Sequence, residues 1–422
     1  MLTLSEYFPP GTEYFYSYPV GDTVYFYNAG DPVAEELISA RLLACAGDDI
    51  KIVVFNSTTK DELLGLLKDH SDIPLIKETQ IIVLPPHINE DVPGLERNKL
   101  IADALLKQTS PGKLLMAQPM LENELVKKYQ IDPKLITWLN DKKNLEKYVP
   151  KELLPERYVY FSNGEDFYNS KVDVPLPCVV KVSASSAAEG VRMCRTREDI
   201  QQAQKDFKER TGTIFIEKFI TYIHNIGLQF GIPFKENVFF PPHVIGHNHQ
   251  VTSVGGEFLG GFIFREEIDE HAEKVKKIID KEILPKIQKM GWYGVGGFDV
   301  LIDAEGKFYI IDSNFRTTGM TAYIFLTRNN LISKSMVSFN GTFDGSEKDF
   351  IKKVFSLNKG KKKILTIISL KQRRTGKGYR FDAALLFDKK EELPALAEKL
   401  MKKGVQSEVL EMLAHGMKDL II

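Results

Sequence analysis

The segment Gly296–Gly319 concentrates residues that could bind a metal ion. Two β-prone runs, Phe298–Ile302 and Lys307–Ile311, flank the tetrapeptide Asp303-Ala304-Glu305-Gly306. Asp at the first position and Gly at the last are typical of a tight turn, so the segment predicts a β-hairpin.

The register of this hairpin decides which side chains meet. If Ala304 and Glu305 form a two-residue loop, Gly297 faces Asp312 and Asp299 faces Ile310. Because side chains alternate between the faces of a strand, one face is then polar, with Asp299, Asp312 and Asn314. The other is apolar, with Phe298, Val300, Ile302 and Ile311. A bulge at Gly306 would change this register.

Two carboxylates and an amide oxygen at a strand end are hard ligands of the kind that Mg²⁺ binds together with water and phosphate. Arg316 follows two residues after Asn314, where a guanidinium could hold a phosphoryl oxygen or a carboxylate. The alternative is a surface hairpin with solvated acids. Apolar neighbours of Asp299 and Asp312 favour the metal site.

Two further segments could bind a nucleotide. Cys178–Cys194 predicts two strands around a small-residue loop, with Lys181 on the first strand and Ser183, Ser185, Ser186 and Gly190 in the loop. Small residues let backbone amides approach phosphate. Thr213–Ile220 predicts a strand whose end, Glu217-Lys218, could contact adenine and ribose. Taken singly, each segment also fits an ordinary hairpin or strand with solvated charges.

The composition describes the scaffold that must position these residues. The 422 residues predict two to four domains, and 43% apolar residues exclude a disordered chain. A net charge of -1 gives no general attraction to nucleic acid or membranes. Three cysteines, no signal peptide and no membrane-length apolar run predict a cytoplasmic protein.

The order of predicted elements indicates a mixed α/β protein. Strands at Thr23–Tyr27, Lys51–Phe55 and Ile81–Pro86, with a helix at Val33–Ala46, predict an N-terminal parallel α/β layer. From Pro175 to Gly345, strands and glycine loops surround one helix, Glu270–Met290. The remainder predicts a small subdomain of strands and a helix, Lys390–Lys403.

The order of these motifs resembles the ATP-grasp superfamily over residues 138–325. Asp312-Ser313-Asn314-Phe315-Arg316 resembles the family's Glu-x-Asn-x-Arg element, and Lys181 matches its nucleotide-binding lysine. Lys142 resembles a second phosphate-binding lysine, while Glu217, Lys218 and Ile220 resemble the hinge that contacts adenine. The length and the extra C-terminal segment look most like pheganomycin-type peptide ligases.

The resemblance implies two lobes clasping ATP and Mg²⁺, with C–N bond formation through an acyl-phosphate. The expected units are residues 1–130 (N-terminal layer), 131–210 (small lobe), 211–345 (large lobe) and 346–422 (C-terminal subdomain). Expected ligands are a small-molecule or peptide carboxylate and an amine, not nucleic acid or membrane. A homodimer is compatible with this reading. Expected phosphate contacts are Lys142, Lys181, Ser185, Ser186 and Gly190, and expected metal ligands are Asp299, Asp312 and Asn314.

The sequence also departs from the family pattern. The loop SASSAAEG has a single glycine, Asp312 replaces a glutamate, and Asn225 is the nearest candidate for the ribose contact. Two rival functions stay open. A kinase would phosphorylate a hydroxyl and stop there, and a non-catalytic module would bind ATP without turnover.

Three other segments allow both a functional interpretation and a purely structural one. His243, His247 and His249 could bind zinc, but Pro241, Pro242 and Gly246 favour a loop. Gln250–Phe264 predicts a hairpin that could line an acceptor pocket, with Arg265 as a candidate catalytic residue holding a substrate carboxylate. The basic segment Lys359–Arg380 is interpreted as a solvated sheet edge rather than a nucleic-acid site.

Overall fold

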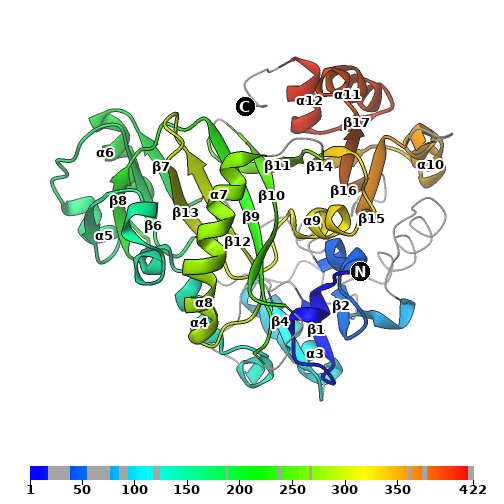
Figure 1. Cartoon of the computed structure of the whole chain (residues 1–422), viewed down its shortest axis with the longest axis horizontal. Coiled ribbons are helices and arrows are strands. Elements are labelled where there is room, and N and C mark those ends of the chain that lie inside the picture. Colours follow the sequence, from blue (N-terminus) through cyan, green and yellow to red (C-terminus); the bar gives the residue numbers. More distant parts are fainter. Residues whose placement is uncertain are drawn as a thin grey trace.

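The described part of the chain folds around three β-sheets, shown in the computed structural model of Figure 1. The structure describes residues 1–17, 39–54, 77–84, 94–109, 111–116, 124–185, 189–235, 240–253, 255–265, 269–358, 363–372 and 378–416. The predicted strand Thr23–Tyr27, residues 33–38 of the predicted helix Val33–Ala46, and Ser186 lie outside these ranges. Within them, no helix combines the length and apolarity needed to cross a bilayer.

The N-terminal sheet is parallel, as predicted. Its strand order is β3-β2-β1-β4, with β1 (Tyr14–Ser17), β2 (Ile50–Val54), β3 (Ile81–Val83) and β4 (Lys113–Met116). Helix α3 (Gly94–Gln108) packs on it through Leu105, which shares a buried cluster with Phe15 and Leu114. Strand β1 was not predicted from the sequence. Its residues, three of them aromatic, do not alternate between apolar and polar, because all four are buried.

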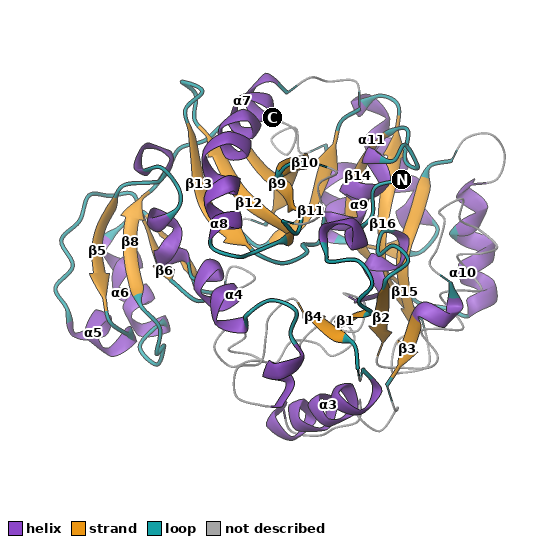
Figure 2. Ribbon diagram, turned by 60° about the horizontal axis from the view of Figure 1, so that its bottom comes forward, coloured by secondary structure: helices purple, strands orange, loops and turns teal. Residues whose placement is uncertain are grey.

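The second sheet is antiparallel and has the order β5-β8-β6-β7. Its strands are β5 (Arg157–Phe161), β6 (Cys178–Val182), β7 (Val191–Cys194) and β8 (Ile214–Lys218). Helices α5 (Gly164–Asn169) and α6 (Arg197–Asp206) supply Phe167, Ile200 and Ala203 to the core of this lobe. A capping box between Thr196 and Asp199 fixes the start of α6. Figure 2 shows this lobe set beside the large sheet.

The large sheet runs in the order β13-β12-β9-β10-β11-β14-β16-β15, with β17 added beside β14. Its first strands are β9 (His224–Ile232), β10 (His243–Thr252), β11 (Phe258–Ile263), β12 (Gly294–Ile302) and β13 (Phe308–Asn314). The others are β14 (Ser335–Phe343), β15 (Leu365–Gln372), β16 (Tyr379–Phe387) and β17 (Val405–Gln406). The strands of the predicted C-terminal subdomain therefore continue the sheet of the large lobe.

Two expectations about this sheet are wrong. The segment around His243–His249 forms a strand, because β9 and β11 pair with it on both sides despite Gly246, where the register shifts. The basic C-terminal segment does contain the edge strand β15, but its residues from Leu365 to Lys371 are buried rather than solvated. The interleaved apolar residues of β15 join the main core.

Helices cover one face of the large sheet (Figure 1). The predicted helix Glu270–Met290 forms α7 (Glu270–Ile278), a π-helical turn (Ile279–Ile283) and α8 (Leu284–Lys289). Val275, Ile279 and Ile287 pack against Phe298 and Val300 of β12. The remaining helices are α4 (Pro133–Asn140), α9 (Thr321–Arg328), α10 (Glu347–Lys353), α11 (Leu393–Lys402) and α12 (Glu408–Ala414).

Candidate active site

The β12–β13 hairpin places Asp299 directly opposite Asp312 and Gly297 opposite Asn314. The expected two-residue loop is wrong. The backbone N–H of Asp303 donates to the carbonyl of Lys307 (2.9 Å), and Gly306 has a φ of +77°, which describes a three-residue turn. A second register shift beside Asp299 leaves one extra residue on β13. The two shifts together keep the polar side chains on one face, as predicted.

The apolar face of the hairpin differs from the expectation at one position. Ile310, not Ile311, joins the buried cluster of Phe298, Val300 and Ile302. Ile311 is the unpaired residue between the partners of Asp299 and Val300. A bulged residue leaves its carbonyl outside the ladder, and here that carbonyl accepts a hydrogen bond from Lys181 Nζ at 3.0 Å.

The carboxylate of Asp299 lies in a strongly polar but dehydrated setting. Gln250 Nε2 donates to its Oδ1 at 2.6 Å, and its Oδ2 lies 3.5 Å from Asn314 Nδ2. Burial, and then the negative charge of Asp312, raise the pKa of Asp299 to about 6. A divalent cation between the two carboxylates would relieve this repulsion, so the oxygen donors present here fit Mg²⁺.

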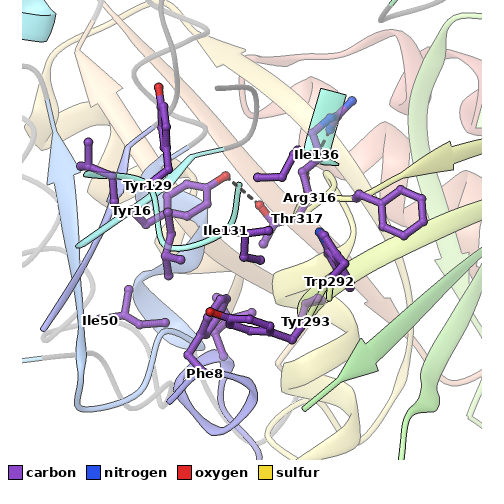
Figure 3. A pocket seen from close by; sticks show the side chains of 15 residues that line it. Phe8, Tyr16, Ile50, Tyr129, Ile131, Ile136, Trp292, Tyr293, Arg316 and Thr317 are labelled. Carbon is purple, nitrogen blue, oxygen red and sulfur yellow. Dashed lines mark hydrogen bonds between the residues drawn. The ribbon is translucent and has the colours of Figure 1, made fainter. Parts of the chain in front are cut away.

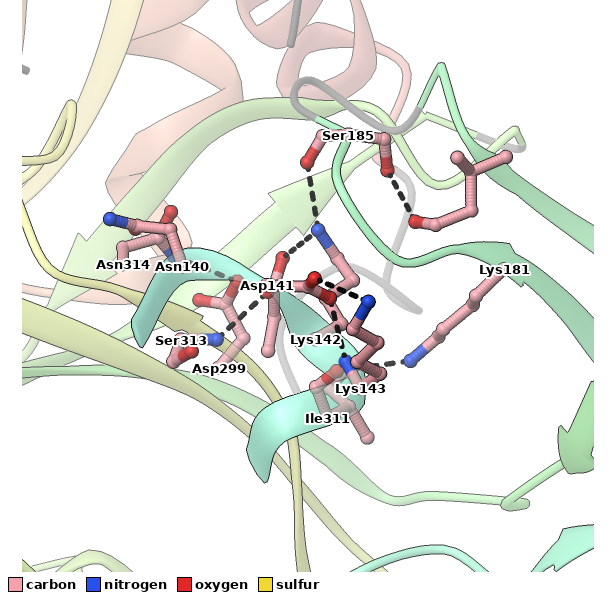
Figure 4. A network of polar contacts seen from close by, with 12 residues as sticks. Asn140, Asp141, Lys142, Lys143, Lys181, Ser185, Asp299, Ile311, Ser313 and Asn314 are labelled. Carbon is pink, nitrogen blue, oxygen red and sulfur yellow. Dashed lines mark hydrogen bonds and ion pairs between the residues drawn. The ribbon is translucent and has the colours of Figure 1, made fainter. Parts of the chain in front are cut away.

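Two buried lysines meet the hairpin from the other lobe (Figure 4). Lys142 Nζ lies 3.2 Å from Asp312 Oδ2 and donates to the carbonyl of Ser185 at 2.8 Å. Its own backbone N–H donates to Ser183. Lys142 thus ties the small-residue loop to the face that carries Asp299 and Asp312, and both lysine side chains are about 6% exposed.

Glu217 holds Lys181 in place through an ion pair of 2.6 Å between Oε1 and Nζ. Both side chains are buried, and Arg157 Nε lies 3.9 Å from Glu217 Oε2. Arg157 also stacks over Phe215 at 4.6 Å and donates to the carbonyls of Lys142 and Lys143. The carboxylate predicted to contact the nucleotide is therefore engaged with a predicted phosphate-binding lysine.

The other predicted nucleotide residues lie around this pair. Ser185 is buried, and its Oγ donates to the carbonyl of Val182 at 3.0 Å. A Cβ on Gly190 would lie 2.4 Å from Ser185 Cβ, so glycine is required for this close approach. Lys218 is exposed and Ile220 is buried at the end of β8.

Arg316 lines an apolar pocket between the N-terminal layer and the large lobe (Figure 3). Within the described part of the chain, its guanidinium donates only to the carbonyl of Thr317, at 3.3 Å, and forms no ion pair. Tyr16 Oη and Thr317 Oγ1 are 2.7 Å apart at the same wall. The other walls are formed mainly by large apolar and aromatic side chains, including Phe8, Ile50, Tyr129, Ile131, Ile136, Trp292 and Tyr293.

Arg265 is not brought to this pocket. Its guanidinium donates to the carbonyl of Thr327 (2.9 Å) and to Asn330 Oδ1 (2.6 Å), at the C-terminal end of α9. Arg316 precedes the N-terminal end of the same eight-residue helix, which is roughly 12 Å long. Arg265 instead satisfies a terminal helix carbonyl, as basic residues do, and it does not line the pocket of Arg316.

Three positioning residues escaped the sequence interpretation. Gln250 orients Asp299, Asn140 Oδ1 accepts the backbone N–H of Phe315 (2.9 Å), and Tyr148 Oη donates to Ser313 Oγ (3.0 Å). Interpreting His243–Thr252 as a strand would have placed Gln250 on the face opposite His249. The other two contacts span over 160 residues and leave no local signal.

Comparisons with known proteins agree with this geometry. Residues 155–314 match a family model described as L-aspartate–L-methionine ligase, ATP grasp. A formate-dependent phosphoribosylglycinamide formyltransferase of Bacillus subtilis is 23% identical over 176 residues, which cover 41% of this chain and 43% of that protein. The chain thus matches less than half the length of this relative.

Solved structures extend the likeness to nearly the whole fold. An ADP complex of N5-carboxyaminoimidazole ribonucleotide synthetase has a TM-score of 0.59 at 14% identity, over 97% of this chain and 99% of that one. An L-amino acid ligase from Bacillus licheniformis has a TM-score of 0.53 at 13% identity, over 94% and 98% of the two chains. The chain therefore has an ATP-grasp fold, and its residues 155–314 are similar to an ATP-grasp ligase family model.

Proposed function

We propose that the protein is an ATP-dependent carboxylate–amine ligase that forms a C–N bond between amino-acid or peptide substrates. One observation carries this proposal: a polar cluster of two buried lysines and two facing carboxylates lies beside an arginine that lines an apolar pocket. The match of residues 155–314 to a ligase family model supports the same activity. The fold that this chain shares with an L-amino acid ligase is compatible with this activity.

In this proposal, ATP lies between the small lobe and the β12–β13 hairpin. Lys142 and Lys181 bind its phosphates, helped by the loop of Ser185, Ser186 and Gly190, while the hinge of Glu217, Lys218 and Ile220 contacts adenine. Asp299, Asp312 and Asn314 would hold Mg²⁺, which would supply positive charge against the phosphates of ATP. Lys142 and Lys181 would then exchange their protein contacts for phosphate oxygens.

The chemistry then depends on positioning. A substrate carboxylate oxygen attacks the terminal phosphorus of ATP, the bond to the bridging oxygen breaks, and ADP leaves. Arg316 stabilises the charge on the phosphoryl group and on the acyl-phosphate product of this step. An amine attacks the acyl carbon, phosphate departs, and the amine loses a proton to complete the amide. Buried surroundings exclude the water that would hydrolyse the acyl-phosphate.

The pocket beside Arg316 suggests the class of substrate. Its aromatic and aliphatic walls fit the side chain of an apolar amino acid. The guanidinium of Arg316, which has no ion-pair partner among the described residues, fits the carboxylate of that same amino acid. We also propose the division into four units (residues 1–130, 131–210, 211–345 and 346–422) and a cytoplasmic location. The three free, buried cysteines agree with a reducing compartment.

The experiment that tests this function is a screen of amino acids and dipeptides, singly and in pairs, for stimulated phosphate release. Mass spectrometry would identify the products. The proposal expects ADP, phosphate and a condensed product that requires both an acid and an amine. Release of AMP and pyrophosphate, or a stable phosphoester of an alcohol, would contradict it.

A further inference from the structure

Histidine and aspartate side chains gather on the face of the large sheet that lies away from Asp299. His247 and His249 belong to β10, where their neighbour Gln250 points to the opposite face and contacts Asp299. Asp269 caps α7, the helix that covers this side of the sheet. Its Oδ2 lies 3.3 Å from His249 Nε2 and 3.8 Å from His247 Nε2.

The two oxygens of the Asp269 carboxylate differ in their contacts. Oδ1 accepts the backbone N–H of Ala272 at 2.9 Å and so fixes the carboxylate at the start of α7. Oδ2 is buried and, among the residues that the structure describes, has no hydrogen-bond partner. The side chain is 11% exposed. A ligating carboxylate held by a hydrogen bond through its second oxygen is the usual arrangement at protein metal sites.

Further unsatisfied polar atoms belong to neighbouring histidine rings. Within the described ranges, the Nδ1 atoms of His224, His249 and His271 are buried without a hydrogen-bond partner. The ring of His224 lies 5.8 Å from that of His249 and 5.6 Å from that of His271. Leaving buried polar atoms unpaired is costly. A metal ion bound by the Nε2 atoms of His247 and His249 would satisfy Oδ2 of Asp269, whereas these Nδ1 atoms lie outside the ligand set.

The spacing of the three ligand atoms fits a small metal ion. His247, His249 and Asp269 each offer an atom within 4.8 Å of the others. Four ligands at 2.0–2.1 Å from a tetrahedral zinc ion would lie roughly 3.3 Å apart. The two distances to Asp269 Oδ2, 3.3 Å and 3.8 Å, are therefore close to those of a bound site.

We propose that His247, His249 and Asp269 form a binding site for a divalent transition-metal ion of the zinc class, with water in the fourth position. Neutral imidazoles and a carboxylate are ligands that Zn²⁺ prefers, whereas Mg²⁺ prefers oxygen alone. The ion would join β10 to the start of α7. This site is separate from the proposed ATP site and does not depend on the proposed activity.

The test is a titration of the full-length protein with Co²⁺ as a spectroscopic substitute for zinc, in excess Mg²⁺ and without ATP. We expect the protein to bind one equivalent of Co²⁺ and the complex to show the visible absorption of four-coordinate Co²⁺. Asp269→Asn keeps the helix cap but removes the ligand charge, and it should weaken binding at least tenfold, as should His249→Ala. His243→Gln, on the same strand outside the cluster, and Asp312→Asn, in the ATP site, should bind as the parent does.

Stability of the unaltered protein gives a second measurement, which does not depend on whether the variants fold. Treatment with a chelator should lower the melting temperature by several degrees, and one equivalent of Zn²⁺ should restore it. Failure of the parent to bind Co²⁺ or Zn²⁺ would overturn the proposal. Equal binding by the parent and by folded Asp269→Asn would also overturn it.

Discussion

Asp299 and Asp312 lie directly opposite each other on β12 and β13 because two irregularities cancel. The three-residue turn at Gly306 would, by itself, place Asp312 on the apolar face of the hairpin. Ile311 adds one more residue to β13 and returns Asp312 to the face of Asp299. The same residue turns its carbonyl toward Lys181, so one bulge shapes both the proposed metal site and a proposed phosphate contact.

Asp312→Asn should abolish ligation and leave the fold intact. Loss of a Mg²⁺ ligand removes several kcal/mol of transition-state stabilisation, so we expect a rate loss of at least about a thousandfold. Steady-state phosphate release measures it, with circular dichroism as the folding check. Asn314→Ala should behave alike. Asp303→Asn, in the turn of the same hairpin, is the control, and activity of Asp312→Asn within a few-fold of this control would place the metal elsewhere.

Lys181→Ala should weaken ATP binding much more than Lys205→Ala. Lys181 is buried against Glu217 and reaches the hairpin, whereas Lys205 is exposed on α6 of the same lobe. Calorimetric titration with a non-hydrolysable ATP analogue measures the difference. Equal affinities for the two variants would show that the phosphates bind in another place.

Tyr16→Phe should raise the KM for the amino-acid substrate and leave the KM for ATP nearly unchanged. The lost hydroxyl lies 2.7 Å from Thr317 Oγ1 at the pocket wall. A hydrogen bond of this kind contributes about 1 kcal/mol. Its loss would loosen the pocket wall, and we expect a rise in KM of up to roughly fivefold. Tyr14→Phe, on the same strand, loses a bond to Pro9 outside the pocket and serves as control. A larger effect on ATP than on the amino acid would contradict the assignment of this pocket.

Gly306→Ala should lower the free energy of unfolding by about 1 kcal/mol or more. Its φ of +77° is strained for any residue with a side chain, and a new Cβ would lie 3.2 Å from the His271 ring. Denaturant unfolding measures the change. Gly212→Ala, where φ is ordinary and the nearest side-chain atom is 3.8 Å away, should change stability far less. Equal changes at the two positions would argue against the turn geometry described here.

The sequence predicted the fold because its signals were local. Alternating side chains marked the hairpin of Asp299 and Asp312, and short apolar runs marked β2, β6 and β8. The histidine segment was misinterpreted because proline and glycine indicate loops, yet pairing with two neighbouring strands overrides that local tendency.

The parts of the candidate site that were missed depend on tertiary contacts. Gln250 of β10 reaches Asp299 of β12 across the intervening strand β9, 49 residues away in the sequence. Asp269 meets His249 through the start of a helix. The position of Arg265 was missed for the same reason, because its nearest partners lie in α9 and just beyond it. Residue type alone does not distinguish an arginine that binds substrate from one that caps a helix.

The most direct test of the proposed function follows oxygen from the substrate to the phosphate. With ¹⁸O in the carboxylate of the acid substrate, attack on the terminal phosphoryl group followed by displacement with the amine must leave one ¹⁸O in the released phosphate. If the reaction follows this acyl-phosphate route, we expect one ¹⁸O atom in the released phosphate for each amide formed, with ADP as the other product. Amide formation with unlabelled phosphate would contradict the acyl-phosphate route.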